Sequence, residues 1–331
     1  MYQEVFENIF LVEIPLPNSP LKSLNSYFFR SSTGGRNLII DSGFNNDVCR
    51  AAFFEAMAAL GFTMDNTDFF ATHLHGDHLG VMYAIEHDID LYLSRIDVEY
   101  LQRRALKNKN NEMKNGDLLT ITKLYGMPAE ILDTLIKAEF MTSRKPRKND
   151  IIKVDENEIF NVGQYRFETI LFPGHTPGHM GLYDKEKKIL ICGDHILGTI
   201  SSNITFWEEG FDSLGSYLNS LVVAKQMDVE HLLCGHRSND FDMYARIDEL
   251  FEHHANRLSE IIDLLSESGE KFTSYDVASK MTWSVKEDMW NKYSTEQKWF
   301  ATGEALAHLE YLYKREKIKK HYIEATFYYS I

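Results

Sequence analysis

The chain has 331 residues, of which 44% are hydrophobic and 13% aromatic, which supplies enough apolar surface for one large domain and a smaller companion. Its formal net charge of −14, from 49 acidic and 35 basic residues, repels polyanions and makes nucleic acid a weak candidate partner. No segment is long enough to span a membrane, and residues 1–7 lack the basic start and apolar core of a secretory signal. We therefore expect a cytoplasmic protein without membrane contact.

The first 60 residues predict the beginning of an α/β domain. Apolar stretches alternate with a Ser-Ser-Thr-Gly-Gly turn at residues 31–35, which predicts a strand hairpin. Residues 38–40 predict an early strand that is followed by a carboxylate, Asp41. Residues 46–60 then place Ala, Phe and Met side chains on one face at helical spacing, which predicts a helix.

A short block after the apolar run 68–72 holds four side chains that can bind a transition metal: His73, His75, Asp77 and His78. Residues two apart point the same way on an extended chain, whereas Asp77 and His78 need the chain to turn first, at Gly76. Residues 79–86 read as a helix, so the block lies between a strand end and a helix start, where open α/β folds place ligands. Three histidines and one aspartate in six residues favour a metal site over a solvated loop.

Three later strands are also predicted to end in metal-competent groups. Residues 167–172 lead into a Pro-Gly-His turn that presents His175. The apolar run 188–193 ends at Asp194, and the run 231–235 ends at His236. Packing alone does not explain four strand ends with such groups. Cys192 and Cys234 each lie two residues before one of these ligands and are expected to be small buried residues, with a thiolate ligand as the alternative.

The middle and the end of the chain read as mostly helical. Residues 94–145 predict helices over 97–107 and 128–140, and the basic residues 144–148 read as a solvated loop that could also approach an anionic substrate. After His236, helical spacing predicts a long helix over 241–267. Gly269 then marks a boundary before three helices and a hairpin, expected over 274–282, 283–293, 295–316 and 318–329.

The strand-end motifs resemble those of the metallo-β-lactamase superfamily, over roughly residues 5 to 240. This resemblance implies a four-layer αβ/βα sandwich that binds two metals at one edge of facing sheets. It places a catalytic domain at 1–240, whose helical insertion at about 94–145 shapes the substrate pocket, and a connecting helix at 241–268. Residues 269–331 are similar to the winged-helix-like C-terminal domain of a glyoxalase II-like hydrolase branch, most clearly at 302–312 and Lys317-Ile318.

The resemblance also implies a ligand set. The first metal site would be formed by His73, His75 and His175, and the second by Asp77, His78 and His236. Asp194 would bridge the two metals, and Asp41 would orient a ligand from behind. We expect two divalent ions, with zinc first and iron or manganese as alternatives.

The function implied is a binuclear hydrolase in which a metal-bridging hydroxide attacks a thioester, ester or related acyl substrate. Asp77 would be catalytic, since it is placed to orient the water or to pass its proton to the leaving group. The partner would be a small acyl or anionic molecule, and a homodimer is possible. The alternatives are a single-stranded RNA endonuclease or phosphodiesterase and a mononuclear iron sulfur dioxygenase, which the complete second site disfavours.

Two features of the C-terminal segment bear on the RNA alternative. Residues 270–331 contain ten basic and nine acidic side chains, which is no strong electrostatic footprint for nucleic acid. Basic residues do cluster near the expected wing, at 314–320. Glu304 and His308 lie four residues apart on a predicted helix, and a solvated helix face is the expected account of both.

Overall fold

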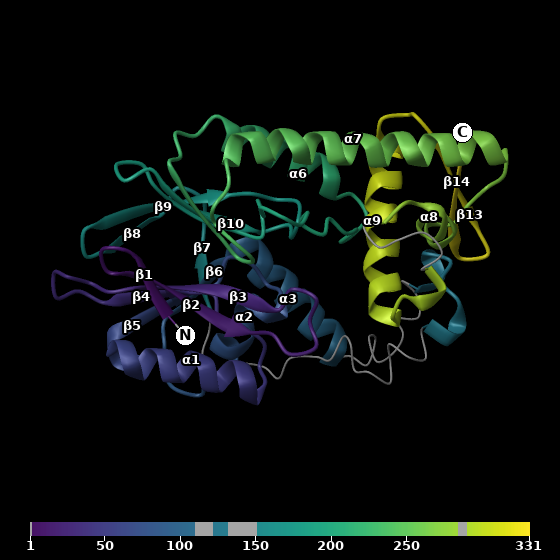
Figure 1. The fold of residues 1–331 in the computed structure, drawn as a ribbon. Helices are drawn as coiled ribbons and strands as arrows, with labels where there is room; N and C mark the ends of the chain where they lie inside the picture. Colours follow the sequence, from purple (N-terminus) through teal and green to yellow (C-terminus); the bar gives the residue numbers. More distant parts are fainter. Residues whose placement is uncertain (1, 110–121, 132–150, 284–289) are drawn as a thin grey trace. The chain divides into compact units, whose positions relative to one another are not determined.

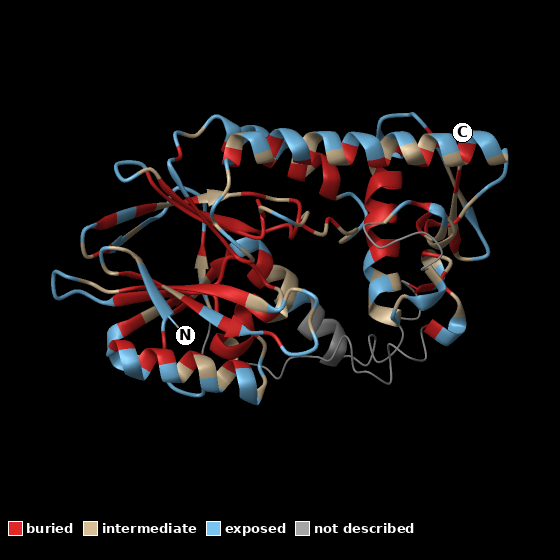
Figure 2. Cartoon of the chain, viewed as in Figure 1, coloured by how far each residue is buried: buried red, intermediate tan, exposed pale blue. Residues whose placement is uncertain are grey.

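The computed structural model describes residues 2–109, 122–131, 151–283 and 290–331, which fold as two compact units (Figure 1). The first unit comprises residues 1–102, 146–202 and 219–247, and the second comprises 103–145, 203–218 and 248–331. The second unit therefore takes in two segments that the sequence analysis assigns to the catalytic domain. Buried residues gather inside each unit, so each has a core of its own (Figure 2).

The first unit contains a seven-stranded sheet in the order β1-β2-β3-β4-β5-β6-β7. Its strands are β1 (Tyr2–Phe6), β2 (Ile9–Pro15), β3 (Ser23–Phe29), β4 (Asn37–Ile40), β5 (Thr67–Phe70), β6 (Leu91–Ser94) and β7 (Ile152–Val154). β1 to β4 pair antiparallel, which confirms the predicted hairpin, whereas β4 to β7 pair in parallel. Parallel pairing brings the carboxyl ends of β4, β5 and β6 to the same end of the sheet.

A second sheet of five strands, in the order β12-β11-β10-β9-β8, belongs to the same unit. Its strands are β8 (Ile159–Val162), β9 (Tyr165–Leu171), β10 (Met180–Asp184), β11 (Ile189–Gly193) and β12 (His231–Cys234). One apolar core cluster contains Phe29 and Phe70 from the first sheet with Phe167 and Leu182 from the second. The two sheets therefore pack face to face.

Helices cover the outer face of the first sheet. α1 (Asp47–Leu60) begins after Asn46, whose side chain accepts a hydrogen bond from the Cys49 amide, and ends at Gly61, where φ is +74°. α1 and α2 (Gly76–Tyr83) share a core cluster with β5. Further helical elements are η1 (Met64–Asn66), α3 (Arg95–Lys109) and α6 (Ser213–Lys225), and the described residues 122–124 and 129–131 are helical as well. The mixed α/β architecture expected from the sequence is confirmed.

The second unit is mainly helical, with a terminal hairpin. Its principal elements are α7 (Met243–Ser268), α8 (Ser274–Lys280), η2 (Trp290–Lys292), α9 (Thr295–Lys314), β13 (Lys319–Ile323) and β14 (Thr326–Ser330). The predicted long helix, the helices at 274 and 295 and the final hairpin are confirmed. The predicted helix over 283–293 falls largely on residues 284–289, outside the described residues, and the winged-helix assignment stays a prediction.

Only parts of the predicted insertion lie within the described residues. The helix expected over 97–107 is part of α3. Of the helix expected over 128–140, only residues 128–131 are described, and the basic segment 144–148 lies outside the described residues. The proposed shaping of a pocket by this insertion therefore stays a prediction.

The expectation of a solvated helix face at Glu304 and His308 is wrong. His308 is fully buried and Glu304 is 8% exposed, because α9 is buried on all sides along residues 301–310 and contributes to the core of its unit. The His308 Nδ1–H donates to the Glu304 carbonyl at 2.8 Å, and Nε2 lies 3.0 Å from His254 Nδ1. Burial lowers the pKa of His308 to about 4, so this imidazole is neutral at pH 7.

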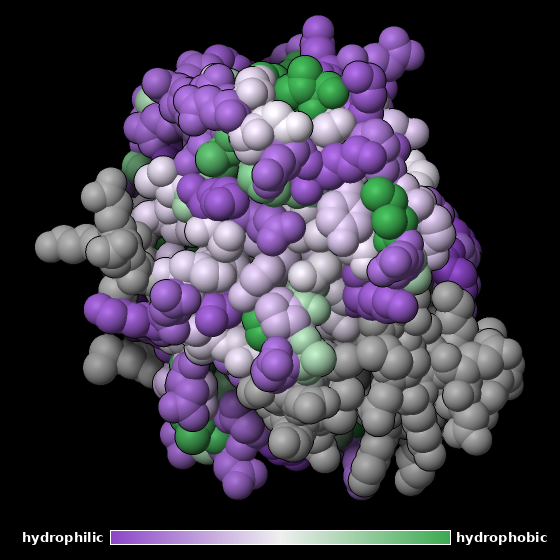
Figure 3. Space-filling model, turned by 90° about the vertical axis from the view of Figure 1, so that its right-hand side faces the viewer, coloured by the Kyte–Doolittle hydropathy of each residue, from purple (hydrophilic) through white to green (hydrophobic). Residues whose placement is uncertain are grey.

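Two of the five basic residues near the predicted wing pair with carboxylates of the protein itself. Lys320 lies 2.7 Å from Glu310, and Arg315 lies 2.9 Å from Asp212. On the face drawn in Figure 3, hydrophobic residues form small separate groups among hydrophilic ones. In the part of the chain that the structure describes, no helix has both the length and the apolar surface to cross a membrane. The predicted homodimer stays a prediction.

Candidate metal centre

The histidine block follows β5, as predicted, but the helix begins three residues earlier than expected. His75 is the residue that precedes α2, and its extended backbone lets the chain turn at Gly76. Asp77 and His78 therefore lie in the first turn of α2, so their side chains approach from the helix start. The predicted alternation from strand to turn to helix is confirmed.

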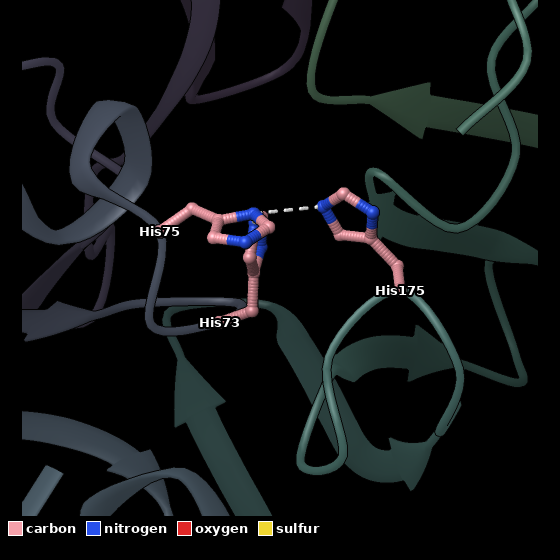
Figure 4. A group of neighbouring side chains, drawn as sticks. All are labelled: His73, His75 and His175. Carbon is pink, nitrogen blue, oxygen red and sulfur yellow. Dashed lines mark hydrogen bonds between the residues drawn. The ribbon is translucent and has the colours of Figure 1, made fainter. Parts of the chain in front are cut away.

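The first group of ligand atoms is formed by three imidazoles, His73, His75 and His175 (Figure 4). His73 Nε2 lies 3.0 Å from His75 Nδ1, which lies 2.9 Å from His175 Nε2. Burial lowers the pKa of His75 to about 3 and that of His73 well below its usual value. Neutral imidazoles that converge in this way offer lone pairs to one cation, which is how they bind transition metals.

The second group is formed by Asp77, His78 and His236. His236 Nε2 lies 3.5 Å from Asp77 Oδ2, and His78 Nε2 lies 4.0 Å from the same oxygen. Burial opposes charge on His236, yet the Asp194 and Asp77 carboxylates outweigh it and raise its pKa to about 10. For Asp77, burial alone would raise the pKa, but His78 and His236 lower it to about 2. This group therefore holds an ionised carboxylate.

Asp194 lies between the two groups. Its Oδ2 is 3.7 Å from His175 Nε2, whereas its Oδ1 is 3.4 Å from His78 Nε2 and 3.5 Å from His236 Nε2. A side chain at Gly235 would collide with Asp194 Oδ1, so a residue without a Cβ lets the end of β12 come this close. Each carboxylate oxygen faces a different group, which is the arrangement expected of a bridging ligand.

The donors fit divalent cations. Buried polar atoms without a hydrogen-bond partner include His78 Nε2 and His236 Nε2 of the second group and Asp194 Oδ1, which faces both of them. An unsatisfied buried polar atom costs about 1–3 kcal/mol, so three that converge on one point indicate that an ion belongs there. Nitrogen and carboxylate donors suit zinc, iron or manganese. The structure thus brings together all seven predicted ligand residues, and the metal's identity stays a prediction.

Asp41 lies behind the second group, as the sequence predicted. Its Oδ2 is 2.7 Å from His78 Nδ1 and 2.8 Å from Thr72 Oγ1, and its Oδ1 accepts from the Thr72 amide at 2.8 Å. Because His78 donates to Asp41 through Nδ1, its Nε2 is the atom that faces the cluster. His236 is oriented in the same way, since its Nδ1–H donates to the Ser23 carbonyl at 2.7 Å.

Two supporting residues were missed by the sequence analysis. His179, in the same turn as His175, is buried, and its Nε2 accepts a hydrogen bond from the Asp194 amide at 3.1 Å. Asp97 is also buried and bonds to both ligand loops. The Ser94-x-x-Asp97 spacing after β6 is typical of a helix start, and that was its only local signal. His179 was visible as a second histidine, but its partner is distant in sequence.

The two cysteines near the ligands are buried and free, as expected. Burial, with a smaller effect of Asp194, raises the pKa of Cys234 to about 12, and burial also raises that of Cys192. Both thiols are therefore protonated at neutral pH, and neither belongs to the groups of converging ligand atoms. The alternative of a thiolate ligand is not supported.

Comparisons with known proteins agree with this geometry. The family model described as "Metallo-beta-lactamase superfamily" matches residues 21–236. "Beta-lactamase-like protein 2 homolog" of Caenorhabditis elegans is 24% identical over 272 residues, which are 80% of this chain and 74% of that protein. The crystal structure of a metallo-beta-lactamase family protein from Thermus thermophilus has a TM-score of 0.79 at 22% identity, and the match covers 98% of this chain and 99% of that one.

Two other relatives carry names that describe a substrate. Human "Acyl-coenzyme A thioesterase MBLAC2" is 24% identical over 169 residues, which are 50% of this chain and 54% of that protein. "Hydroxyacylglutathione hydrolase GloC" of Haemophilus influenzae is 30% identical over 83 residues, or 25% of this chain and 39% of that protein. The matched stretch therefore spans about half of the first of these relatives and less of the second.

Proposed function

The chain belongs to the metallo-β-lactamase superfamily and is a hydrolase of that type, and we propose that it uses two divalent ions to hydrolyse thioesters or related acyl esters. The observation that carries this proposal is the position of Asp194, whose two oxygens face the two groups of histidines. The names of two relatives, an acyl-coenzyme A thioesterase and a hydroxyacylglutathione hydrolase, support a thioester as the substrate class.

Bound at these positions, two ions would supply a water of lowered pKa and would polarise the acyl oxygen. The residues of the chain hold the rest of the arrangement. Neutral His73 and His75 present lone pairs, because burial disfavours their protonation at neutral pH. Asp41 keeps the proton of His78 on Nδ1, so that Nε2 stays available to the cluster.

Asp77 is proposed as the residue that handles the proton. Its carboxylate is ionised at neutral pH, and it is 8% exposed, while the neighbouring His75 is half-buried and His78 and His236 are fully buried. The cluster is thus closest to solvent on the side of His75 and Asp77, where an acyl substrate would arrive. There, the Asp77 carboxylate would accept a proton from the attacking water and return it to the leaving thiolate or alkoxide.

The RNA alternative receives less support. Arg315 and Lys320, in the basic cluster near the predicted wing, are paired with Asp212 and Glu310 and are not free for phosphates. The iron dioxygenase alternative requires one metal, whereas the second group is complete in Asp77, His78 and His236. Both alternatives remain outcomes of the experiment that follows.

The test combines metal analysis with a substrate panel on one preparation. Purified protein is assayed for zinc, iron and manganese. It is then tested on acyl-coenzyme A, S-acylglutathione, a phosphodiester and single-stranded RNA, before and after chelation. We expect about two ions per chain and thioester cleavage that chelation abolishes. RNA cleavage without thioester cleavage would replace the proposal by the nuclease, and a single iron with oxygen uptake would replace it by the dioxygenase.

A further inference from the structure

We propose that Asp97 is a positioning residue that fastens the two ligand loops of the first metal group to each other. This inference rests on the proposed function, since it assigns a role in the binding of one of the two ions. Asp97 lies in the first turn of α3, which follows β6 directly, and its side chain is fully buried. It is not itself one of the converging ligand residues.

The contacts of Asp97 reach both loops. Its Oδ2 accepts from the Leu74 amide at 2.9 Å, and Leu74 is the residue between His73 and His75. The same oxygen accepts from Thr176 Oγ1 at 3.0 Å, next to His175, and Oδ1 accepts from the Gly178 amide at 2.8 Å. One carboxylate thus bonds to two loops that lie about a hundred residues apart in sequence, each beside a ligand of the same group.

The second loop packs so closely against the start of α3 that Gly178 has no space for a side chain. A Cβ at Gly178 would lie 2.6 Å from Asp97 Oδ1 and would also collide with Ser94 Oγ. Ser94 Oγ in turn accepts from the Asp97 amide at 3.2 Å, which fixes the start of the helix. The backbone itself joins the two loops at their base, where the Met180 amide donates to the Thr72 carbonyl at 2.8 Å. Asp97 adds the connection close to the ligands.

The burial of this carboxylate argues against a role in packing alone. The described residues include no cation paired with Asp97, and burial raises its pKa to about 7 against the three donors that favour the charged form. A buried carboxylate is costly, and an apolar residue would pack at lower cost. What the carboxylate provides is two acceptor atoms that bind three donors on two loops. Asp97 thus supports the first group through its two loops, whereas Asp41 supports the second by a direct bond to the His78 ring.

The test compares metal binding by Asp97→Asn with that of the wild type, by zinc competition against a chromophoric chelator and by the absorption spectrum of the cobalt-substituted protein. Asn has the same shape as Asp, but its NH2 group donates a hydrogen bond where the carboxylate oxygen accepts one. We expect one of the two ions to bind about 10- to 100-fold more weakly, while the other keeps its affinity. Thr176→Val, which removes one of the three donors, should weaken the same ion by about three- to tenfold.

Asp155→Asn is the matched control, because Asp155 is an exposed carboxylate that pairs with Arg95 at the start of the same helix. It should bind both ions as the wild type does. Unchanged affinity in both Asp97→Asn and Thr176→Val would overturn the inference, and Thr176→Val decides it if Asp97→Asn fails to fold. A wild type that binds fewer than two ions would instead contradict the two-metal function. The Asp97 inference would then still be decided by the affinity for the remaining ion.

Discussion

Buried histidines occur in both units, but they are arranged differently. In the first unit, ring nitrogens and carboxylate oxygens of seven residues converge, and several of these atoms lack any hydrogen-bond partner. In the second unit, His308 donates to the Glu304 carbonyl and its Nε2 lies 3.0 Å from His254 Nδ1. His254 Nε2 also lacks a hydrogen-bond partner, but among the described residues it belongs to no group of converging ligand atoms. Within the described ranges, both groups of converging ligand atoms, and Asp194 between them, belong to the first unit.

The buried carboxylates of the two units also have different partners. In the second unit, the Glu304 carboxylate lies 4.0 Å from the guanidinium of Arg257 and accepts from Asn203 at 3.4 Å, so the protein supplies its own cation. Asp194 and Asp77 face imidazoles instead of Lys or Arg. Buried histidines and a buried carboxylate within one unit are therefore a weak indication of a metal. Convergence of three or more imidazole and carboxylate ligand atoms without a Lys or Arg partner is a strong one.

Asp194→Ala tests this comparison with the largest expected effect. Removal of the proposed bridging carboxylate should release both ions and lower thioester turnover by about 10³-fold or more, because both groups would lose a shared ligand. Metal content and kcat/KM of the purified variant are the measurements. The matched change in the other unit is Glu304→Ala, which should keep two ions per chain. Metal loss in Glu304→Ala, or full metal content with full activity in Asp194→Ala, would break the comparison.

Metal removal should affect the stability of the two units unequally. An ion that binds only the folded state stabilises it by about 4 kcal/mol when its free concentration is about 1,000 times Kd. Chelation should therefore speed amide hydrogen exchange in the segment from β5 to α2, which carries four of the ligands, and leave α9 largely unchanged. Exchange measured by mass spectrometry with and without chelator reports both. Equal loss of protection in α9 would mean that the metals support both units.

The local part of the site was predictable from sequence because its spacing is short. Alternation on a strand followed by a turn accounts for His73, His75, Asp77 and His78 without any long-range information. The positions of His175, Asp194 and His236 at strand ends marked them as candidates. Only the family resemblance assigned them to the same site, because β9, β11 and β12 belong to the other sheet. The fold class followed from the same motifs by resemblance.

The supporting residues were not predictable, because their partners are far away in sequence. Asp97 bonds to residues 23, 79 and 81 positions away, and no local pattern separates it from an ordinary helix-start aspartate. The burial of Glu304 and His308 was missed for a related reason. Polar residues spaced four apart indicate a solvated face only when the rest of the helix is amphipathic, whereas α9 is enclosed on all sides through its middle.

The smallest expected effect is the pH dependence of the unfolding free energy of the metal-free protein. It tests whether burial in the second unit holds His308 neutral. The pKa of His308 is lowered from 6.5 to about 4 by burial, so the unfolded chain binds this proton first as the pH falls. The contribution of His308 to the free energy of unfolding should therefore be constant above pH 6.5 and should fall by about 3 kcal/mol at most between pH 6.5 and 4. His308→Gln removes the titrating group, so its unfolding free energy should decline less steeply over that range.

The exposed substitution His87→Gln should reproduce the wild-type slope. Urea unfolding at several pH values, followed by circular dichroism, measures the three slopes. Parallel curves for wild type and His308→Gln would mean that His308 is not held neutral by burial, and the contrast with the metal-ligating histidines would then rest on geometry alone.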